Sequence, residues 1–329
     1  MTSLTLTCIG RQQNTHDVVS WQLAPLSGSL PPVLAGQCIT LHTEIDGQPE
    51  CRAYTLSSSP QDACWQVTIK DVGRVSRHLH QTLQVGDKIR VDGPFGDFNL
   101  TALPCERPLL LSAGSGITPM WSMLRDELAK RPDADIRFIH SARSPADVIF
   151  ADDLATLAAA HSGVRHALIL EEAPADHPWI GRLTPAMLAE LAPDLRERHV
   201  YLCGPAPYMA AVSAMLAELG LPPEQLHQES FGLPPAKPAT TTSDHFWLTL
   251  KKSGKKVKIL PGQTLLAALE AAGETMMAAC RSGVCGSCRC TTTGDIERQS
   301  VMTLSAQDLE SGVALACSCT AKGDISLDY

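Results

Sequence analysis

The chain has 329 residues, a net charge of −8 at pH 7 and 44% hydrophobic residues, enough for two or three domains that each bury a core. Its acidic balance argues against a nucleic-acid partner, which requires clustered positive charge. No apolar stretch reaches the roughly 20 residues of a membrane span, and the N-terminus lacks the pattern of a secretory signal. Because its twelve cysteines are spread through a long chain, we expect reduced thiols and a cytoplasmic location.

The first part of the chain, residues 1–103, reads as short strands separated by turns. Apolar and β-branched residues alternate there between clusters of Gly, Pro, Ser and Asp. The expected strands cover residues 38–45, 51–56, 65–70 and 88–93. A helical pattern over 75–83 interrupts them. This arrangement predicts a small antiparallel β-barrel.

Residues 104–231 change to alternating strands and helices. Strands are expected over 108–114, 136–142, 166–172 and 199–205. Helices are expected over 120–130, 153–160, 184–192 and 208–220. The alternation predicts an α/β domain, in which helices cover a parallel sheet.

Residues 232–244, GLPPAKPATTTSD, have no apolar periodicity and predict an extended linker. The remaining segment, 245–329, is expected to form a β-grasp-like unit. Its predicted elements are a hairpin at 246–260, a helix at 264–273, a strand at 289–297, a helix at 305–312 and a strand at 324–329.

Four cysteines of this last unit have the spacing of a metal centre: Cys280, Cys285, Cys288 and Cys317. Three of them form a Cys-x4-Cys-x2-Cys loop, and the fourth follows much later, as in plant-type [2Fe–2S] centres. Zinc sites favour two separated Cys-x2-Cys pairs, and only one close pair is present here. Gly283 and Gly286 would let the backbone fold tightly around the cluster.

Two further motifs lie in the barrel segment. Arg52 offers a positive charge for a phosphate, and Tyr54 lies on the same strand face, where it could stack on a flat ring, with the Thr55 hydroxyl at the ring edge. Downstream, Gly73 opens a helix whose first N–H groups and Ser76 hydroxyl could hold a phosphate.

The α/β segment carries two motifs at the ends of predicted strands. Gly114 and Gly116 follow the first strand and precede a helix, where a pyrophosphate can approach closely; Pro119 suits the first helical turn. Cys203, followed by Gly204-Pro205, ends a later strand, at the edge where α/β sheets bind cofactors.

The order of these motifs resembles the ferredoxin–NADP reductase superfamily, specifically flavoreductases with a C-terminal plant-type ferredoxin domain. The resemblance spans essentially the whole chain. It implies FAD rather than FMN, one [2Fe–2S] cluster and NADH as electron donor. A flavin links the other two groups, because it takes both electrons of a hydride and releases them singly.

The resemblance also assigns residues. It implies that the flavin is bound by Arg52, Tyr54, Thr55, Gly73, Val75 and Ser76. It places the dinucleotide at Gly114, Gly116, Thr118, Pro119, Cys203, Gly204 and Pro205. Glu229 and Phe231 are expected beside the flavin ring, and Thr55, Cys203 and Glu229 are expected to tune the ring edge and the transition-state geometry.

Longer phrases resemble the NADH oxidoreductases that serve hybrid-cluster proteins: RAYTLSSSP, DVIFAD, CGPAPYM and TLSAQDLESGVALACSC. They imply that the acceptor is a hybrid-cluster protein, which reduces nitric oxide or hydroxylamine. A reductase of a Rieske-type oxygenase or demethylase is the alternative, since it can share the domain order. A non-catalytic electron carrier or redox sensor is the alternative of another class, but it would not need the dinucleotide loop.

The choice of nucleotide is less clear from the residues themselves. Arg143 and Ser144 follow the second strand of the α/β segment, where an arginine could receive a 2′-phosphate. No acidic residue ends that strand to accept the ribose 2′-hydroxyl. These residues therefore favour NADPH, whereas the resemblance implies NADH. We expect NADH to be the electron donor.

Overall fold

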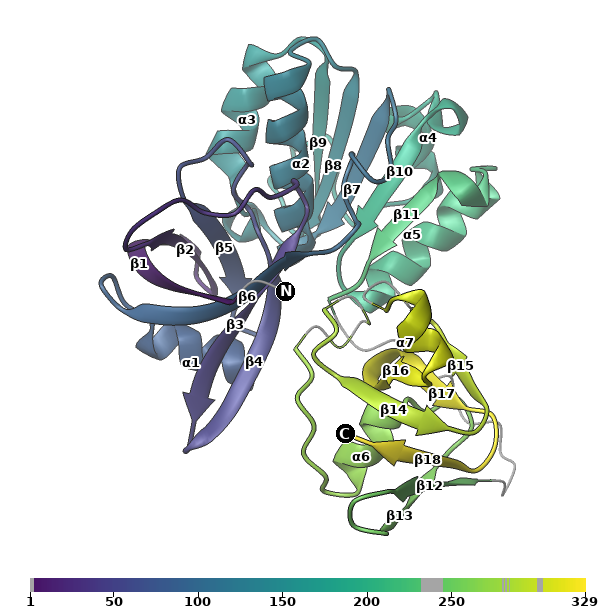
Figure 1. Ribbon diagram of the computed structural model, residues 1–329. Helices are drawn as coiled ribbons and strands as arrows, with labels where there is room; N and C mark the ends of the chain where they lie inside the picture. Colours follow the sequence, from purple (N-terminus) through teal and green to yellow (C-terminus); the bar gives the residue numbers. More distant parts are fainter. Residues whose placement is uncertain (1–2, 232–244, 280, 282, 284, 301–303) are drawn as a thin grey trace. The chain divides into compact units, whose positions relative to one another are not determined.

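The computed structural model describes residues 3–231, 245–279, 281, 283, 285–300 and 304–329 (Figure 1). The chain divides into two compact units. The first is Met1–Ile39 with Tyr54–Ser230, and the second is Thr40–Ala53 with Phe231–Tyr329. Among the residues described, no helix is both long and apolar enough to cross a membrane.

An antiparallel sheet of six strands forms in the N-terminal segment, with the order β4-β3-β6-β1-β2-β5. Its strands are β1 (Ser3–Thr15), β2 (Val18–Pro25), β3 (Cys38–Ile45), β4 (Gln48–Thr55), β5 (Trp65–Lys70) and β6 (Lys88–Phe95). The helix α1 (Arg74–Thr82) lies between β5 and β6 in the chain. Trp21 of β2 is fully buried, and its Nε1 donates to the Leu83 carbonyl at 3.1 Å, which attaches the end of α1 to the sheet.

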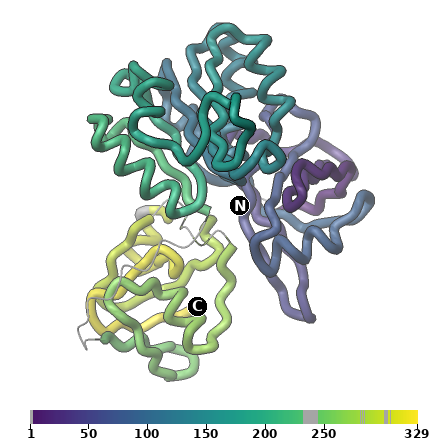
Figure 2. The backbone as a smooth tube through the Cα atoms, turned by 180° about the vertical axis from the view of Figure 1, so that it is seen from behind, coloured from purple at the N-terminus to yellow at the C-terminus, as the bar shows by residue number. Residues whose placement is uncertain are grey.

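The parallel sheet of the α/β segment has the order β11-β10-β7-β8-β9. Its strands are β7 (Pro108–Ala113), β8 (Ile136–Ala142), β9 (Val164–Leu170), β10 (His199–Cys203) and β11 (Leu226–Glu229). Its helices are α2 (Ile117–Lys130), α3 (Ala151–Ala160), α4 (Pro185–Leu191) and α5 (Ala206–Glu218), which can be followed from behind in Figure 2. The predicted α/β architecture is confirmed, with β11 as an additional short strand.

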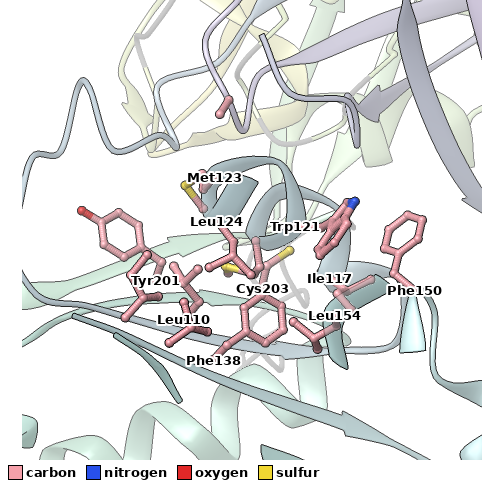
Figure 3. Packing of buried hydrophobic residues seen from close by; sticks show 14 of the residues in the cluster. Leu110, Ile117, Trp121, Met123, Leu124, Phe138, Phe150, Leu154, Tyr201 and Cys203 are labelled. Carbon is pink, nitrogen blue, oxygen red and sulfur yellow. The ribbon is translucent and has the colours of Figure 1, made fainter. Parts of the chain in front are cut away.

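Alternation along the strands sends neighbouring side chains to opposite faces of this sheet. Leu110 and Tyr201 belong to the core that α2 and α3 cover, where Figure 3 shows them near Leu124. Leu109 and Val200 belong to the core under α4 and α5. Since both faces are buried, β7 is apolar almost throughout, as its sequence PLLLSA indicates.

The C-terminal segment forms a mixed sheet with the order β13-β12-β18-β14-β16. Its strands are β12 (Phe246–Leu250), β13 (Lys256–Ile259), β14 (Arg289–Thr293), β16 (Val313–Leu315) and β18 (Ile325–Asp328). A second, two-stranded sheet joins β15 (Ile296–Arg298) to β17 (Cys319–Ala321). The helices are α6 (Leu265–Ala271) and α7 (Ala306–Glu310).

One predicted strand of this segment is divided. Residues 289–297 were expected to be continuous, but β14 ends at Thr293 and β15 begins at Ile296. Gly294 has a φ of +116°, and a Cβ there would lie 2.8 Å from the Ile325 Cγ2 atom. The break therefore depends on a glycine, which can adopt this conformation and leave room for Ile325.

An ion network lies at the amino ends of the parallel strands, opposite the end where cofactors bind in such sheets. Arg198 precedes β10 and its side chain is fully buried. Its Nη2 lies 2.7 Å from Asp135 Oδ1 and 2.8 Å from Asp194 Oδ2. Arg107, before β7, also contacts both carboxylates. The network therefore links the amino ends of β7, β8 and β10.

Replacing Asp194 by Asn should lower the free energy of unfolding by about 3 kcal/mol, because a buried guanidinium loses one of its carboxylates. Arg198 holds the pKa of Asp194 well below its usual value. The stabilisation is therefore present above the unfolded-state pKa of about 3.9 and is lost as the pH falls below it. Urea unfolding at pH 7 and pH 3 measures both effects. Glu197→Gln, at a 68% exposed side chain, is the control. Equal losses in the two variants would contradict the role of the buried network.

Candidate functional site

Two of the predicted motifs meet where the strand order reverses. The chain runs from β7 outward through β8 and β9, then returns to place β10 on the other side of β7. A Cβ added to Gly116 would lie 2.3 Å from the Cys203 carbonyl oxygen and 2.7 Å from Gly204 N. The glycine loop after β7 therefore packs directly on the Cys-Gly-Pro segment after β10. Crevices of this kind bind ligands in open α/β sheets.

Cys203 is fully buried at the end of β10. It is paired in register with Glu229 of β11. Burial, and to a lesser degree the negative charge of Glu229, raises the pKa of Cys203 well above its usual value. The thiol is therefore neutral at physiological pH, which argues against a thiolate nucleophile.

A pocket of about 420 Å³ opens at the carboxyl ends of β7, β8 and β9. Two predicted dinucleotide residues line it, Gly114 (φ +52°) and Pro205, together with Arg143. Sequence reasoning missed other lining residues: Lys70, Ser141, Asp147, Glu171, Arg182 and Tyr208. Two of them had a local signal: Tyr208 follows Cys-Gly-Pro by three residues, and Asp147 begins the segment DVIFAD.

Two buried hydroxyls, Tyr208 Oη and Ser141 Oγ, face each other and have no other hydrogen-bond partner among the residues described. Burial raises the pKa of Tyr208, so its hydroxyl stays protonated. Buried polar atoms of this kind cost free energy unless they are paired. They suit a pocket that receives a polar ligand. The lining therefore fits part of a dinucleotide.

Deeper in the same sheet, His140 of β8 is fully buried, with Nδ1 2.9 Å from Ser112 Oγ of β7. Burial lowers the pKa of His140 to about 4. The ring is neutral at pH 7 and serves to join two strands next to the pocket.

Other predicted dinucleotide residues have local roles in the loop itself. Thr118 is buried, and its hydroxyl donates to the Ser115 carbonyl at 3.0 Å. Pro119 is buried in the first turn of α2. Their contact with a nucleotide stays a prediction.

The predicted flavin residues of the barrel segment lie on β4. Arg52 is partly exposed, and its Nη1 donates to the Cys51 carbonyl at 2.7 Å and lies 3.7 Å from Glu50 Oε2. Tyr54 is half-buried, and Thr55 is buried at the end of the strand. Arg52 belongs to the second compact unit, whereas Tyr54 and Thr55 belong to the first. Their shared role at a flavin stays a prediction.

At the start of α1, Gly73 caps the helix and Ser76 closes its first turn. The Ser76 hydroxyl accepts from Gly73 N at 2.9 Å and donates to the Gly73 carbonyl at 3.0 Å. Val75 packs in the core. Since this hydroxyl is engaged within the turn, the helical N–H groups are the better candidates for phosphate donors.

The last two predicted residues lie near the end of the α/β segment. Glu229 is half-buried, and Phe231 is 43% exposed.

Three of the four predicted cluster cysteines are described, and Cys280 lies outside the described residues. Cys285, Cys288 and Cys317 are buried, and the sulfurs of Cys288 and Cys317 are 3.2 Å apart. The Gly283 N–H donates to Cys317 Sγ at 3.2 Å. Buried thiols approached by backbone N–H donors fit an iron–sulfur cluster, because such donors stabilise thiolate charge.

Two other cysteines lie in the same core. Cys290 and Cys319 are buried, and burial raises the pKa of Cys290 to about 12.

The conformation of the cysteine loop requires glycine at position 283. The φ of Gly283 is +80°, and a Cβ there would lie 2.6 Å from Ser318 Oγ. The predicted need for glycine at this position agrees with the geometry.

Family models match three successive segments of the chain. The FAD-binding domain of oxidoreductases matches residues 12–100, and the NAD-binding domain of oxidoreductases matches 110–214. The 2Fe-2S iron-sulfur cluster binding domain matches 248–322. The predicted FAD, NAD and [2Fe–2S] groups therefore each have a matching domain.

Relatives match along almost the whole chain. The glycine betaine monooxygenase reductase subunit of Pseudomonas aeruginosa is 36% identical, over 98% of this chain and 94% of that protein. The NADH oxidoreductase HCR of Escherichia coli is 34% identical, over 90% of this chain and 88% of its own. The solved structure of phthalate dioxygenase reductase has a TM-score of 0.63 and 25% identity, covering 99% of this chain and 98% of that one. The chain thus belongs to the ferredoxin–NADP reductase superfamily, as an oxidoreductase with FAD-binding, NAD-binding and C-terminal [2Fe–2S] domains.

Proposed function

We propose that this oxidoreductase takes a hydride from NADH and passes electrons singly, through its [2Fe–2S] domain, to a partner protein. The observation that carries the proposal is the dinucleotide pocket at the point where strand order reverses, in a chain that also buries Cys285, Cys288 and Cys317. A carrier or sensor without catalysis would need only the second feature. The domains proposed for these steps are residues 1–103, 104–231 and 245–329, with 232–244 as the linker.

When bound, the flavin supplies the conversion between hydride transfer and single-electron transfer. The protein supplies position and electrostatics. Gly116 against Cys203 fixes the two loops on which the nicotinamide end of the donor would rest. Because the Cys203 thiol is buried and neutral, it adds no charge and excludes water there. Thr55 and Glu229 are proposed to orient the ring edge, and Arg52 to neutralise a flavin phosphate.

At the cluster, the chain supplies thiolate ligands and a low-dielectric setting. The N–H of Gly283 at Cys317 Sγ, and that of Cys317 at 3.5 Å from Cys288 Sγ, stabilise negative charge on sulfur. We propose Cys280 as the fourth ligand, from its spacing alone.

We propose a hybrid-cluster protein as the acceptor. The support is the resemblance of phrases such as CGPAPYM and TLSAQDLESGVALACSC, and the 34% identity to the E. coli NADH oxidoreductase. The second candidate is the oxygenase component of a monooxygenase or demethylase, which the 36% identity to the betaine monooxygenase reductase subunit favours.

An anaerobic assay separates the two acceptors. With NADH and the holoprotein, reduction of hydroxylamine by an added hybrid-cluster protein should exceed reduction of a Rieske-type oxygenase component by about tenfold or more. Such a ratio corresponds to about 1.4 kcal/mol in transition-state stabilisation. Faster reduction of the oxygenase component would assign the chain to the second candidate.

Replacing Cys285 by Ser should remove the iron but leave the flavin. The variant should still reduce ferricyanide with NADH, because a small oxidant can take electrons from the flavin, and it should fail with the protein acceptor. Cys290→Ser is the matched control, since Cys290 is a buried thiol of the same core that we do not assign as a ligand. Iron content, absorbance and both activities are measured. Full protein-acceptor activity in the iron-free variant would exclude the serial route.

NADH should be preferred to NADPH by about tenfold or more in kcat/KM, a difference of about 1.4 kcal/mol. Rapid bleaching of the flavin absorbance on anaerobic addition of NADH would also separate the enzyme from a passive carrier. A preference for NADPH that Arg143→Ala abolishes would show that the arginine after β8 dominates the choice.

A further inference from the structure

A short segment after β4, residues 58–62, is bonded to α2 within the first compact unit. The carbonyl of Ser58 accepts from Ser122 Oγ at 2.6 Å, and both residues are buried. Arg125 donates to the Asp62 carboxylate twice, from Nη1 to Oδ2 at 2.7 Å and from Nη2 to Oδ1 at 2.8 Å. Two parallel bonds between a guanidinium and a carboxylate fix orientation as well as distance.

The residues of α2 that make these contacts lie on one face of the helix. Ser122, Arg125 and Asp126 are three and four residues apart, and such positions are neighbours on a helix surface. The largely buried Asp126 accepts from Gln61 Nε2 at 2.8 Å. The same face continues at Thr118, four residues before Ser122, in the first turn of α2, where we expect the dinucleotide to bind.

The same segment is also attached to the antiparallel sheet. Thr55, the last residue of β4 and a predicted flavin residue, precedes Ser58 by three positions. Between them, Leu56 pairs with Val67 of β5. The Ser58 hydroxyl accepts from Gln66 N, also of β5, at 3.0 Å. Segment 58–62 therefore connects the end of the strand with the flavin motif to the helix that follows the glycine loop.

Arg125 is also held by an aromatic ring. Its Cζ lies 5.7 Å from the ring centroid of Trp121, which stacks on Phe150 with their centroids 5.4 Å apart (Figure 3). The Arg125 and Asp62 side chains are only 31% and 30% exposed. A guanidinium can lie over a ring and donate two parallel bonds at the same time, which an ammonium group cannot do. This arrangement is therefore specific to arginine.

We propose that the Asp62–Arg125 pair positions NADH for hydride transfer to the flavin, by fixing α2 relative to the end of β4. The proposal rests on the function proposed above and adds to it two positioning residues. An apolar core that includes Val18 and Phe98 also joins these parts of the chain. Apolar burial has no preferred direction, whereas hydrogen bonds do, so the polar contacts set the orientation. A misplacement of about 1 Å can slow such a reaction about 100-fold.

Arg125→Gln and Asp62→Asn test the proposal. Arg131→Gln is the matched control, because Arg131 forms its ion pair with Glu127 of the same helix and does not contact segment 58–62. Anaerobic stopped-flow reduction of each holoprotein by NADH gives the rate of hydride transfer and the Kd of NADH. Each test variant should lower the rate at saturating NADH about tenfold, without a matching loss of NADH affinity. The control should keep the wild-type rate.

The double variant Asp62→Asn/Arg125→Gln shows whether the two side chains act as one unit. Because each single variant already removes the same interaction, the double variant should lose about as much rate as either one. Arg125→Lys should recover only part of the rate, since lysine keeps the charge and loses the two parallel bonds. Losses that multiply in the double variant, or full recovery by lysine, would overturn the role of this pair.

A spectroscopic readout separates position from turnover. Excess NADH leaves reduced flavin beside NAD⁺, and their long-wavelength charge-transfer absorbance requires the two rings to be in contact. This absorbance should weaken in the Asp62 and Arg125 variants and persist in the Arg131 control. Gln61→Ala, at an exposed side chain, removes another contact of segment 58–62 and should weaken the same absorbance, so the test does not depend on the folding of the Arg125 variant.

Two failures can be told apart. An unchanged absorbance and rate in Arg125→Gln and Gln61→Ala, in proteins whose flavin NADH reduces normally, would overturn the positioning role. A wild-type protein whose flavin NADH does not reduce would instead overturn the proposed function.

Discussion

Gly116 has no space beside it for a side chain, and the geometry of the dinucleotide region depends on this steric constraint. No side chain fits between this residue and the carbonyl of Cys203, so the loop after β7 and the end of β10 are held in direct backbone contact. This contact fixes the crevice where the strand order reverses. The buried thiol of Cys203 and the position of Gly114 at the pocket both follow from it. Residues far apart in the sequence are thereby brought to one edge of one sheet.

The two ends of the parallel sheet show a division between stability and function. At the amino ends, Arg198 is buried between two carboxylates, and charges there are satisfied within the protein. At the carboxyl ends, the hydroxyls of Tyr208 and Ser141 have only each other as partners among described residues, and Glu171 and Arg182 form one exposed ion pair. Polar groups at this edge are thus less fully paired than those at the opposite edge, which suits a sheet that binds a ligand at its carboxyl ends.

Local motifs could be predicted from the sequence, whereas contacts between distant segments could not. The spacing of Cys285 and Cys288 predicts a cluster loop inside the segment that matches a 2Fe-2S domain, and the apolar run of β7 indicated a strand buried on both faces. β1 and β2 were not predicted individually; β1 includes the polar run Arg11–Asn14 and is stabilised by pairing with β2 and β6. Glu171 and Arg182 belong to separate segments without a motif, so only the folded chain shows that they share a pocket.

The complete burial of Cys203 has a consequence for chemical labelling. A reagent that modifies thiols from solution can reach the half-buried Cys64 in the folded protein, whereas it reaches Cys203 only when the sheet opens. The rate at which Cys203 is alkylated therefore reports the free energy of local opening at the crevice. A bound nucleotide that holds the two loops together should slow that rate, so this buried sulfur is a built-in probe of ligand occupancy.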